Sequence, residues 1–96
     1  MLESEVEKKL KTRVQKELNG LALKFVSPGF NGVPDRIILV PYGRIYFVET
    51  KAPNKKLRKL QKWVCDLIKG LGFEVLRIDT IEKVEEFIRG VQEDGI

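Results

Sequence analysis

The chain has 96 residues, of which 43% are hydrophobic and 33% are charged, and it carries a net charge of +4. These values indicate one soluble globular domain over residues 1–96 and favour a polyanionic partner. No apolar run approaches the roughly 20 residues that cross a bilayer, so we expect an intracellular, cytoplasmic protein with no membrane partner. One cysteine and no histidine exclude an internal disulfide, a Cys–His nucleophile and a structural zinc site within one chain. Any bound metal must therefore have oxygen ligands, as magnesium and manganese do.

The first predicted element is a helix that begins near Glu5. Ser4 and Glu7 have the spacing of a capping box. Apolar residues recur at helical spacing at Val6, Leu10, Val14 and Leu18. Asn19 and Gly20 are typical of a helix end.

A β-hairpin is predicted in the middle of the chain. The segments in order are a strand over 21–26, a Gly- and Pro-rich loop over 27–34, and two further strands over 35–40 and 44–51. Pro41 suits the first position of a three-residue turn, and Gly43 can adopt the left-handed conformation that such a turn requires.

The turn sets the register of the hairpin. If Val40 pairs with Arg44, Asp35 lies directly opposite Glu49, with Cβ atoms about 5 Å apart. Lys51 follows two residues later on the same face. A turn longer or shorter by one residue would send the two acids to opposite faces of the sheet.

Two facing carboxylates repel each other, and a shared divalent cation would offset that repulsion. With Lys51 close by, Asp35 and Glu49 would suit phosphodiester hydrolysis, in which a metal polarises the phosphate and a lysine stabilises developing charge. The plainer alternative is that Asp35 caps a turn while Glu49 and Lys51 form an exposed ion pair.

The carboxyl-terminal half predicts a strand–helix–strand unit and a last helix. Asn54 can cap a helix that ends near Lys69, a strand follows over 73–79, and Thr80 can cap the third helix. Cys65 lies among apolar residues and is expected to be a packing residue. The element order is therefore α-β-β-β-α-β-α, an α/β fold with a mixed sheet flanked by helices.

Basic residues follow Lys51 with no acid until after Lys62. The candidates for phosphate contact in this segment are Lys55, Lys56, Arg58, Lys59 and Lys62. The alternative is that they form a solvated helix face. Trp63 adjoins the apolar stripe of the same helix and is expected in the core or at an interface.

The string "GVPD…FVETK" resembles the active-site signature of the PD-(D/E)xK nuclease superfamily, and most closely its compact VRR-NUC branch, which includes stand-alone phage-type proteins. The similarity extends to "SEVEKKL", "LALKFVSPG" and "KAPNKKLRKLQKW", so it covers nearly the whole chain. It implies a restriction-endonuclease-like core and a nuclease that depends on magnesium or manganese.

The resemblance also assigns roles to individual residues. Asp35, Glu49 and the backbone carbonyl of Thr50 would hold the metal, and Lys51 would be the catalytic lysine. The downstream catalytic glutamine matches Gln61, for which the alternative is an exposed surface position. The family's helix-1 glutamate matches Glu5 best. Glu3 is possible, and Glu5 could instead serve only the electrostatics of the helix amino-terminus.

The leading hypothesis is an Mg²⁺- or Mn²⁺-dependent endodeoxyribonuclease for branched DNA, such as the four-way (Holliday) junction that relatives of this type resolve. Because 96 residues offer little surface for a duplex and a symmetric junction needs two cuts, we expect a homodimer. No organic cofactor is expected. A non-catalytic nucleic-acid-binding module and a structural or partner-binding protein of a phage or mobile element are the alternatives.

Overall fold

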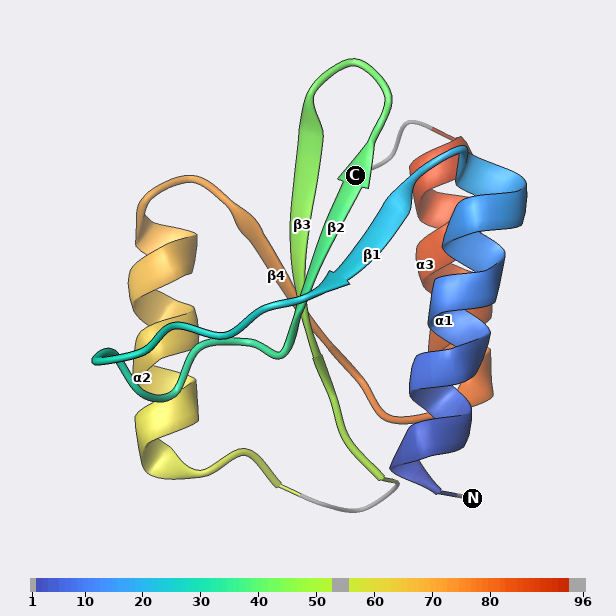
Figure 1. The fold of residues 1–96 in the computed structure, drawn as a ribbon. Coiled ribbons are helices and arrows are strands. Elements are labelled where there is room, and N and C mark those ends of the chain that lie inside the picture. Colours follow the sequence, from blue (N-terminus) through green and yellow to red (C-terminus); the bar gives the residue numbers. More distant parts are fainter. Residues whose placement is uncertain (1, 53–55, 94–96) are drawn as a thin grey trace.

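The computed structural model describes residues 2–52 and 56–93 (Figure 1). Its elements are α1 (Glu3–Leu18), β1 (Leu21–Lys24), β2 (Arg36–Val40), β3 (Arg44–Thr50), α2 (Lys59–Gly70), β4 (Glu74–Ile78) and α3 (Ile81–Gln92). This order confirms the predicted α-β-β-β-α-β-α arrangement. Within the described residues no helix is long and apolar enough to cross a membrane.

The four strands form one mixed sheet in the order β1-β2-β3-β4. β1–β2 and β2–β3 pair antiparallel, whereas β3–β4 pair in parallel because α2 lies between them in the chain. Figure 1 shows α1 and α3 side by side on one face of the sheet and α2 on the other face. The molecule therefore has three layers.

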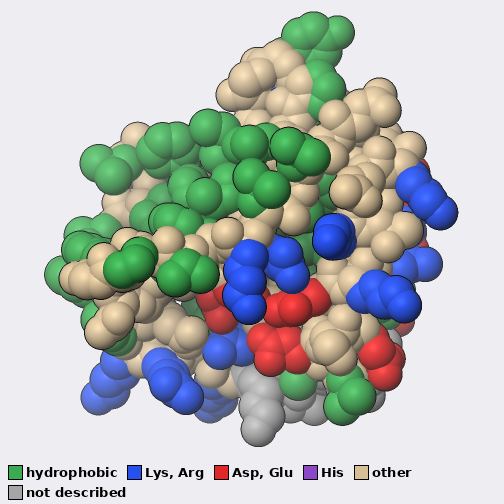
Figure 2. All heavy atoms as spheres, in the orientation of Figure 1, with side chains coloured by type: hydrophobic (Ala, Val, Ile, Leu, Met, Phe, Trp, Pro, Cys, Tyr) green, Lys and Arg blue, Asp and Glu red, His purple; other side chains and the backbone are tan. Residues whose placement is uncertain are grey.

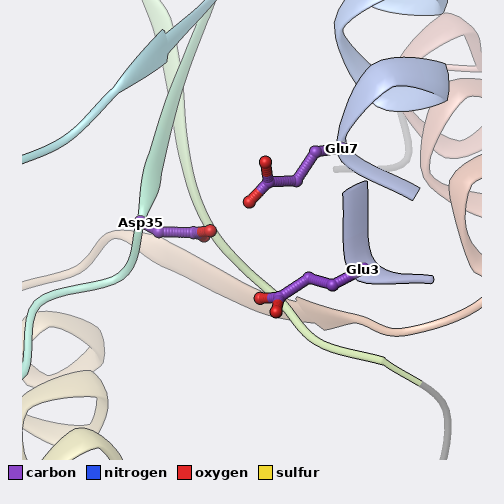
Figure 3. A group of neighbouring side chains, drawn as sticks. All are labelled: Glu3, Glu7 and Asp35. Carbon is purple, nitrogen blue, oxygen red and sulfur yellow. The ribbon is translucent and has the colours of Figure 1, made fainter. Parts of the chain in front are cut away.

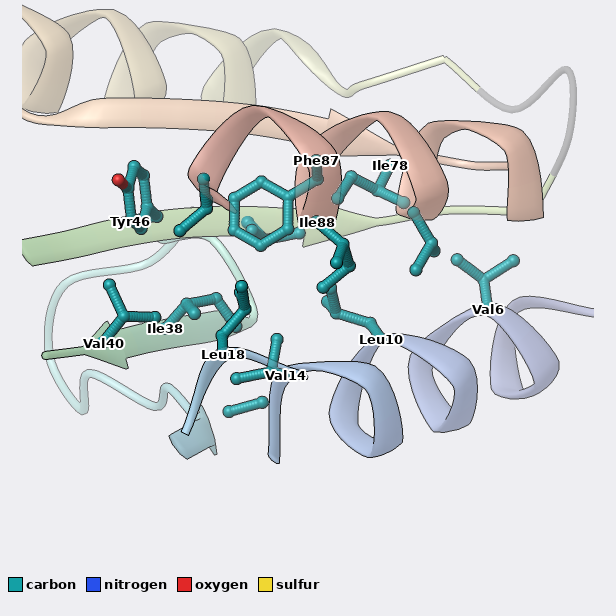
Figure 4. Packing of buried hydrophobic residues seen from close by; sticks show 14 residues of the cluster. Val6, Leu10, Val14, Leu18, Ile38, Val40, Tyr46, Ile78, Phe87 and Ile88 are labelled. Carbon is teal, nitrogen blue, oxygen red and sulfur yellow. The ribbon is translucent and has the colours of Figure 1, made fainter. Parts of the chain in front are cut away.

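The hydrophobic core lies between the sheet and the α1–α3 layer (Figure 4). The apolar stripe of α1, namely Val6, Leu10, Val14 and Leu18, is buried along its whole length, as predicted. It meets alternate residues of β2 and β3, Ile38, Tyr46 and Val48, and the buried face of α3, Val84, Phe87, Ile88 and Val91. This rigid block positions the amino-terminus of α1 against the strand ends.

The opposite face of the sheet is covered less completely. α2 buries only Val64 and Cys65 among the described residues, and it packs against β4. Cys65 is buried, as predicted. Toward β1 and the hairpin tip, Leu21, Leu23 and Ile45 remain 38–50% exposed.

The hairpin turn has the predicted length. Val40 pairs with Arg44, and the ladder continues to the Arg36–Val48 pair. Gly43 has φ +72°, and Tyr42 also has a positive φ of +70°. The predicted register is therefore confirmed from Val40–Arg44 to Arg36–Val48, and Asp35 stands one residue before the first paired residue of β2.

Two predicted helix starts are wrong. α1 begins at Glu3 with Leu2 as its cap and no side-chain capping bond, because Glu7 contacts strand residues instead of closing a capping box. α2 begins at Lys59, with Arg58 at the cap position, because residues 56–58 are not helical; the predicted cap Asn54 lies outside the described residues. Thr80 caps α3 as predicted, since its hydroxyl accepts from the Lys83 main-chain N–H at 3.1 Å.

Candidate active site

Three acids from two separate elements meet at one end of the sheet. Glu3 and Glu7 project from the first turns of α1, and Asp35 stands immediately before β2 (Figure 3). One carboxylate oxygen from each lies within 4.8 Å of the other two. Glu7 and Asp35 are half-buried, whereas Glu3 is exposed at the rim.

Thr50, the last residue of β3, joins two of these acids. It is fully buried, and its main-chain N–H donates to Oδ1 of Asp35 at 2.9 Å. Its Oγ1 lies 2.6 Å from Oδ2 of Asp35 and 2.9 Å from Oε1 of Glu7. Arg36 adds an ion pair to Glu7 at 3.5 Å. Strand β3 therefore anchors both carboxylates.

The pKa values of the two carboxylates that Thr50 joins, Asp35 and Glu7, are shifted in opposite directions. Burial, with the adjacent charge of Glu7, raises the pKa of Asp35 despite its bonds from Thr50. Burial also acts to raise the pKa of Glu7, but hydrogen bonds with Asp35 and Thr50 and the charge of Arg36 outweigh it and lower that pKa. Burial and the neighbouring charge of Glu7 therefore disfavour the ionised form of Asp35, and a bound cation would offset this effect.

Glu49 forms a second group with two polar residues. Its buried carboxylate lies 3.5 Å from Nζ of Lys51 and accepts from Nε2 of Gln61 at 3.4 Å. Burial raises the pKa of Glu49, and the negative charge of Asp35 raises it further against the opposing effect of Lys51. The charge of Asp35 thus acts on both groups.

Several residues predicted from the sequence to form the site lie close together. Asp35, Glu49, Lys51 and Gln61 all lie at this end of the sheet. The expected face-to-face arrangement of two carboxylates is wrong in one respect. The Asp35 carboxylate lies against Thr50 and Glu7, so it turns toward α1, whereas Glu49 contacts Gln61 on α2.

The structure does not bring Glu5, the predicted helix-1 glutamate, to the other acids. Glu5 is exposed and lies outside the acidic group, which contains Glu3 and Glu7 instead. Helix geometry explains this: at about 100° per residue, Glu3 and Glu7 fall on the side of the buried stripe, whereas Glu5 falls roughly opposite. The phase of the apolar residues was a signal in the sequence that could have identified Glu7.

The basic residues lie at the start of α2, on the side of the molecule that bears the acids. Among the candidates for phosphate contact, Lys56, Arg58, Lys59 and Lys62 are exposed, and Lys55 lies outside the described residues. Figure 2 shows Lys and Arg side chains around a cluster of acidic side chains on one face of the molecule. Trp63 is 56% exposed, so it is not part of the core.

The donor set fits a hard divalent cation. Carboxylate oxygens are the protein ligands that Mg²⁺ and Mn²⁺ prefer, and no sulfur or imidazole ligand lies in the acidic group. Burial and neighbouring charge disfavour the ionised form of Asp35, and a cation held by the acids would relieve this. The residues present are therefore suited to a divalent metal.

Comparisons with known proteins agree with this geometry. No family model matches the sequence. The "Putative nuclease p44" of Acyrthosiphon pisum secondary endosymbiont phage 1 is 44% identical over 78 residues, which are 81% of this chain and 83% of the phage protein. A solved structure described as a VRR_NUC domain superposes with a TM-score of 0.84 at 31% identity, covering 91% of this chain and 94% of that one. The chain therefore belongs to the VRR-NUC nuclease family.

Proposed function

We propose that this protein is a metal-dependent endonuclease that hydrolyses phosphodiester bonds of DNA, with branched DNA such as a four-way junction as its substrate. One observation carries the proposal. Acids from α1, from the residue before β2 and from β3 converge at one end of the sheet, and a lysine and a glutamine lie beside them. Membership of a nuclease family supports the same conclusion.

Mg²⁺ or Mn²⁺ would be held by Asp35 and Glu49 together with Glu7, and by the backbone carbonyl of Thr50. Glu3 takes the more exposed position at the rim, and exposed Glu5 lies outside this ligand set. A bound ion of this kind polarises a phosphate oxygen and lowers the pKa of a coordinated water.

Lys51 and Gln61 supply the remaining chemistry. The Nζ of Lys51, held 3.5 Å from Glu49, provides a fixed positive charge that would stabilise negative charge developing on the scissile phosphate. Gln61 donates to the same carboxylate and would orient it, and its amide could also position the attacking water. Because Lys51 is only 18% exposed at its side chain, its ammonium stays near the reaction site.

DNA would approach over the exposed basic residues at the start of α2, namely Lys56, Arg58, Lys59 and Lys62, with Lys55 as a further candidate. Such residues bind phosphates regardless of base sequence, which suits an enzyme that recognises DNA shape. We propose that the enzyme acts in the cytoplasm. If a phage encodes it, that cytoplasm is the one of the bacterial host.

A homodimer would supply the two active sites that a symmetric junction requires. An apolar face supports this. It surrounds a groove of about 490 Å³ lined by Phe25, Phe30, Phe47, Leu67, Leu71 and Phe73. Through Phe30 it continues to Leu60 and Trp63, and through Phe73 to Ile45. Figure 2 shows hydrophobic side chains gathered over one side of the molecule, next to the charged residues.

The size of this apolar face fits a second copy of the chain. Seven of its large hydrophobic side chains are 38–76% exposed, namely Phe30, Ile45, Leu60, Trp63, Leu67, Leu71 and Phe73. With side-chain surfaces on the order of 150–250 Å² each, they present roughly 700 Å². One partner in a standard interface contributes about 800 Å², whereas the largest patch on a typical monomer is about 300–600 Å².

A cleavage assay tests the proposal. Four-way junction, flap, linear duplex and single-stranded DNA are incubated with Mg²⁺, Mn²⁺ or EDTA, with Asp35→Ala and Lys51→Ala alongside. We expect metal-dependent incision of the junction that falls by at least about 100-fold in both variants. Binding without incision in every metal would instead support the alternative, a non-catalytic nucleic-acid-binding module. Neither binding nor incision would support a structural or partner-binding role.

A further inference from the structure

Thr50, which lies between Glu49 and Lys51 in the chain, contacts two other acids, Asp35 and Glu7. Its side chain is fully buried and points to the α1 side of the sheet, away from the Glu49 carboxylate. There its hydroxyl lies within hydrogen-bond distance of Asp35 at 2.6 Å and of Glu7 at 2.9 Å. One hydroxyl thus links an acid that precedes β2 to an acid on α1.

We propose that the hydroxyl of Thr50 is the positioning group that holds Glu7 and Asp35 together as one pair of metal ligands. The inference rests on the proposed function, since it concerns the same site. It assigns to the Thr50 side chain a role distinct from that of its backbone carbonyl. Thr50 does not touch the substrate; it acts through the two acids that it orients.

The contacts of Thr50 favour this role over the simpler explanation that a buried hydroxyl needs a hydrogen-bond partner. One acceptor satisfies the single proton of a buried threonine hydroxyl, yet the Thr50 Oγ1 lies between two carboxylates that both come within hydrogen-bond distance. Its main-chain N–H donates to the other oxygen of Asp35. Asp35 is thereby held at both oxygens and cannot rotate freely. Arg36 also contacts Glu7, at 3.5 Å, but through Oε2 rather than the oxygen near Thr50.

The stiffness of Thr50 strengthens its hold on α1. Threonine is restricted at χ1, so its hydroxyl keeps a fixed direction once the strand is formed. β3 lies between β2 and β4, and the Lys51 main-chain N–H, one residue beyond Thr50, donates to Ile78 O at 3.0 Å. The hydroxyl is therefore presented from a paired strand to the amino-terminal turns of α1.

Thr50→Val tests the inference, because valine keeps the shape and the main-chain N–H but removes the hydroxyl. Mn²⁺ binding is measured by calorimetry and by the loss of the free Mn²⁺ electron paramagnetic resonance signal. We expect Thr50→Val to weaken Mn²⁺ binding by about 10-fold or more, as removal of groups that orient metal ligands typically does. Thr50→Ser, which keeps the hydroxyl, should stay within about threefold of the wild type.

Two comparisons separate positioning from stability. Thr80→Val removes the capping hydroxyl of α3, so it should lower Tm in EDTA without changing Mn²⁺ affinity. The double variant Thr50→Val with Glu7→Gln should bind Mn²⁺ no more weakly than the worse single variant, because both changes disrupt the same pair.

The outcomes distinguish this inference from the proposed function. If the wild type binds no Mn²⁺, the proposed metal site itself is wrong. If the wild type binds Mn²⁺ and folded Thr50→Val binds it equally well, or if the two substitutions are additive, Thr50 has only a structural role and the inference is overturned. Circular dichroism confirms that each variant is folded before its affinity is compared.

Discussion

At the scale of single residues, burial makes the ionised forms of two acids in the candidate site unfavourable in the metal-free protein. Asp35 and Glu49 both have raised pKa values, caused first by burial and then by neighbouring negative charge. A raised pKa means that the folded protein binds protons more readily than the unfolded chain. Without metal, stability should therefore be lost as pH rises from the ordinary carboxylate pKa values through these raised values, and regained as pH falls.

Asp35→Asn should separate stability from activity. The amide keeps the shape of the carboxylate, can accept from the Thr50 main-chain N–H and can donate to its hydroxyl, so no buried group loses its partner. In EDTA at pH 7 we expect Tm to rise by a few degrees, since about 1 kcal/mol shifts a domain of this size by roughly 4–8 °C. Mn²⁺ binding and incision should be lost.

The pH dependence provides the control for that variant. The wild type in EDTA should gain stability as pH falls through the raised pKa values toward the ordinary carboxylate range, and Asp35→Asn should gain less because one of the two groups no longer titrates. Thermal unfolding at several pH values measures both curves. An Asp35→Asn protein that is less stable than the wild type at pH 7 would contradict the claim that the metal-free site carries unfavourable charge.

At the scale of elements, the relative phase of a helix and a strand determines which acids meet. The hairpin register could be predicted because it depends only on the length of the Pro41–Gly43 turn and on strand alternation. The turning of the Asp35 carboxylate toward α1 could not, because it depends on Thr50 and on the docking of a distant helix. A family motif identifies that α1 contributes an acid, but the buried stripe decides which one.

Paired substitutions on α1 test this assignment by helix phase. Glu7→Gln should weaken Mn²⁺ binding by about 10-fold or more, because Glu7 lies within the acidic group and contacts Thr50. Glu5→Gln removes the same charge from the same helix two residues away, on an exposed side chain, and should change affinity by less than about twofold. Calorimetry with Mn²⁺ measures both, and equal losses would show that general helix charge matters rather than position.

At the scale of the whole molecule, the two faces of the sheet serve different purposes. The face covered by α1 and α3 forms a continuous core and fixes the site. The other face is only partly covered by α2 and leaves a large apolar surface beside the basic residues. Sequence periodicity predicted that helices flank the sheet, but it could not predict how much of each face they cover, because that depends on helix placement.

Leu71→Glu tests whether this apolar face joins two copies of the chain. Leu71 is 76% exposed and lines the apolar groove, so the substitution should leave the fold of the monomer intact. At an interface, however, it would bury an unpaired charge, and the dimer Kd should rise by at least about 100-fold. Tyr42→Glu is the matched control, since Tyr42 is 96% exposed at the hairpin tip.

Light scattering and sedimentation should give the wild type and Tyr42→Glu twice the 11.1 kDa of one chain, and Leu71→Glu the mass of a monomer. Each monomer retains the whole acidic group, because Glu3, Glu7 and Asp35 come from the same chain. Leu71→Glu should therefore still nick a junction with metal but lose paired incision of opposite strands. If the wild type sediments as a monomer at about 100 μM, the proposal that the apolar face is a dimer interface is wrong. Its junction cutting would then have to proceed by two independent encounters.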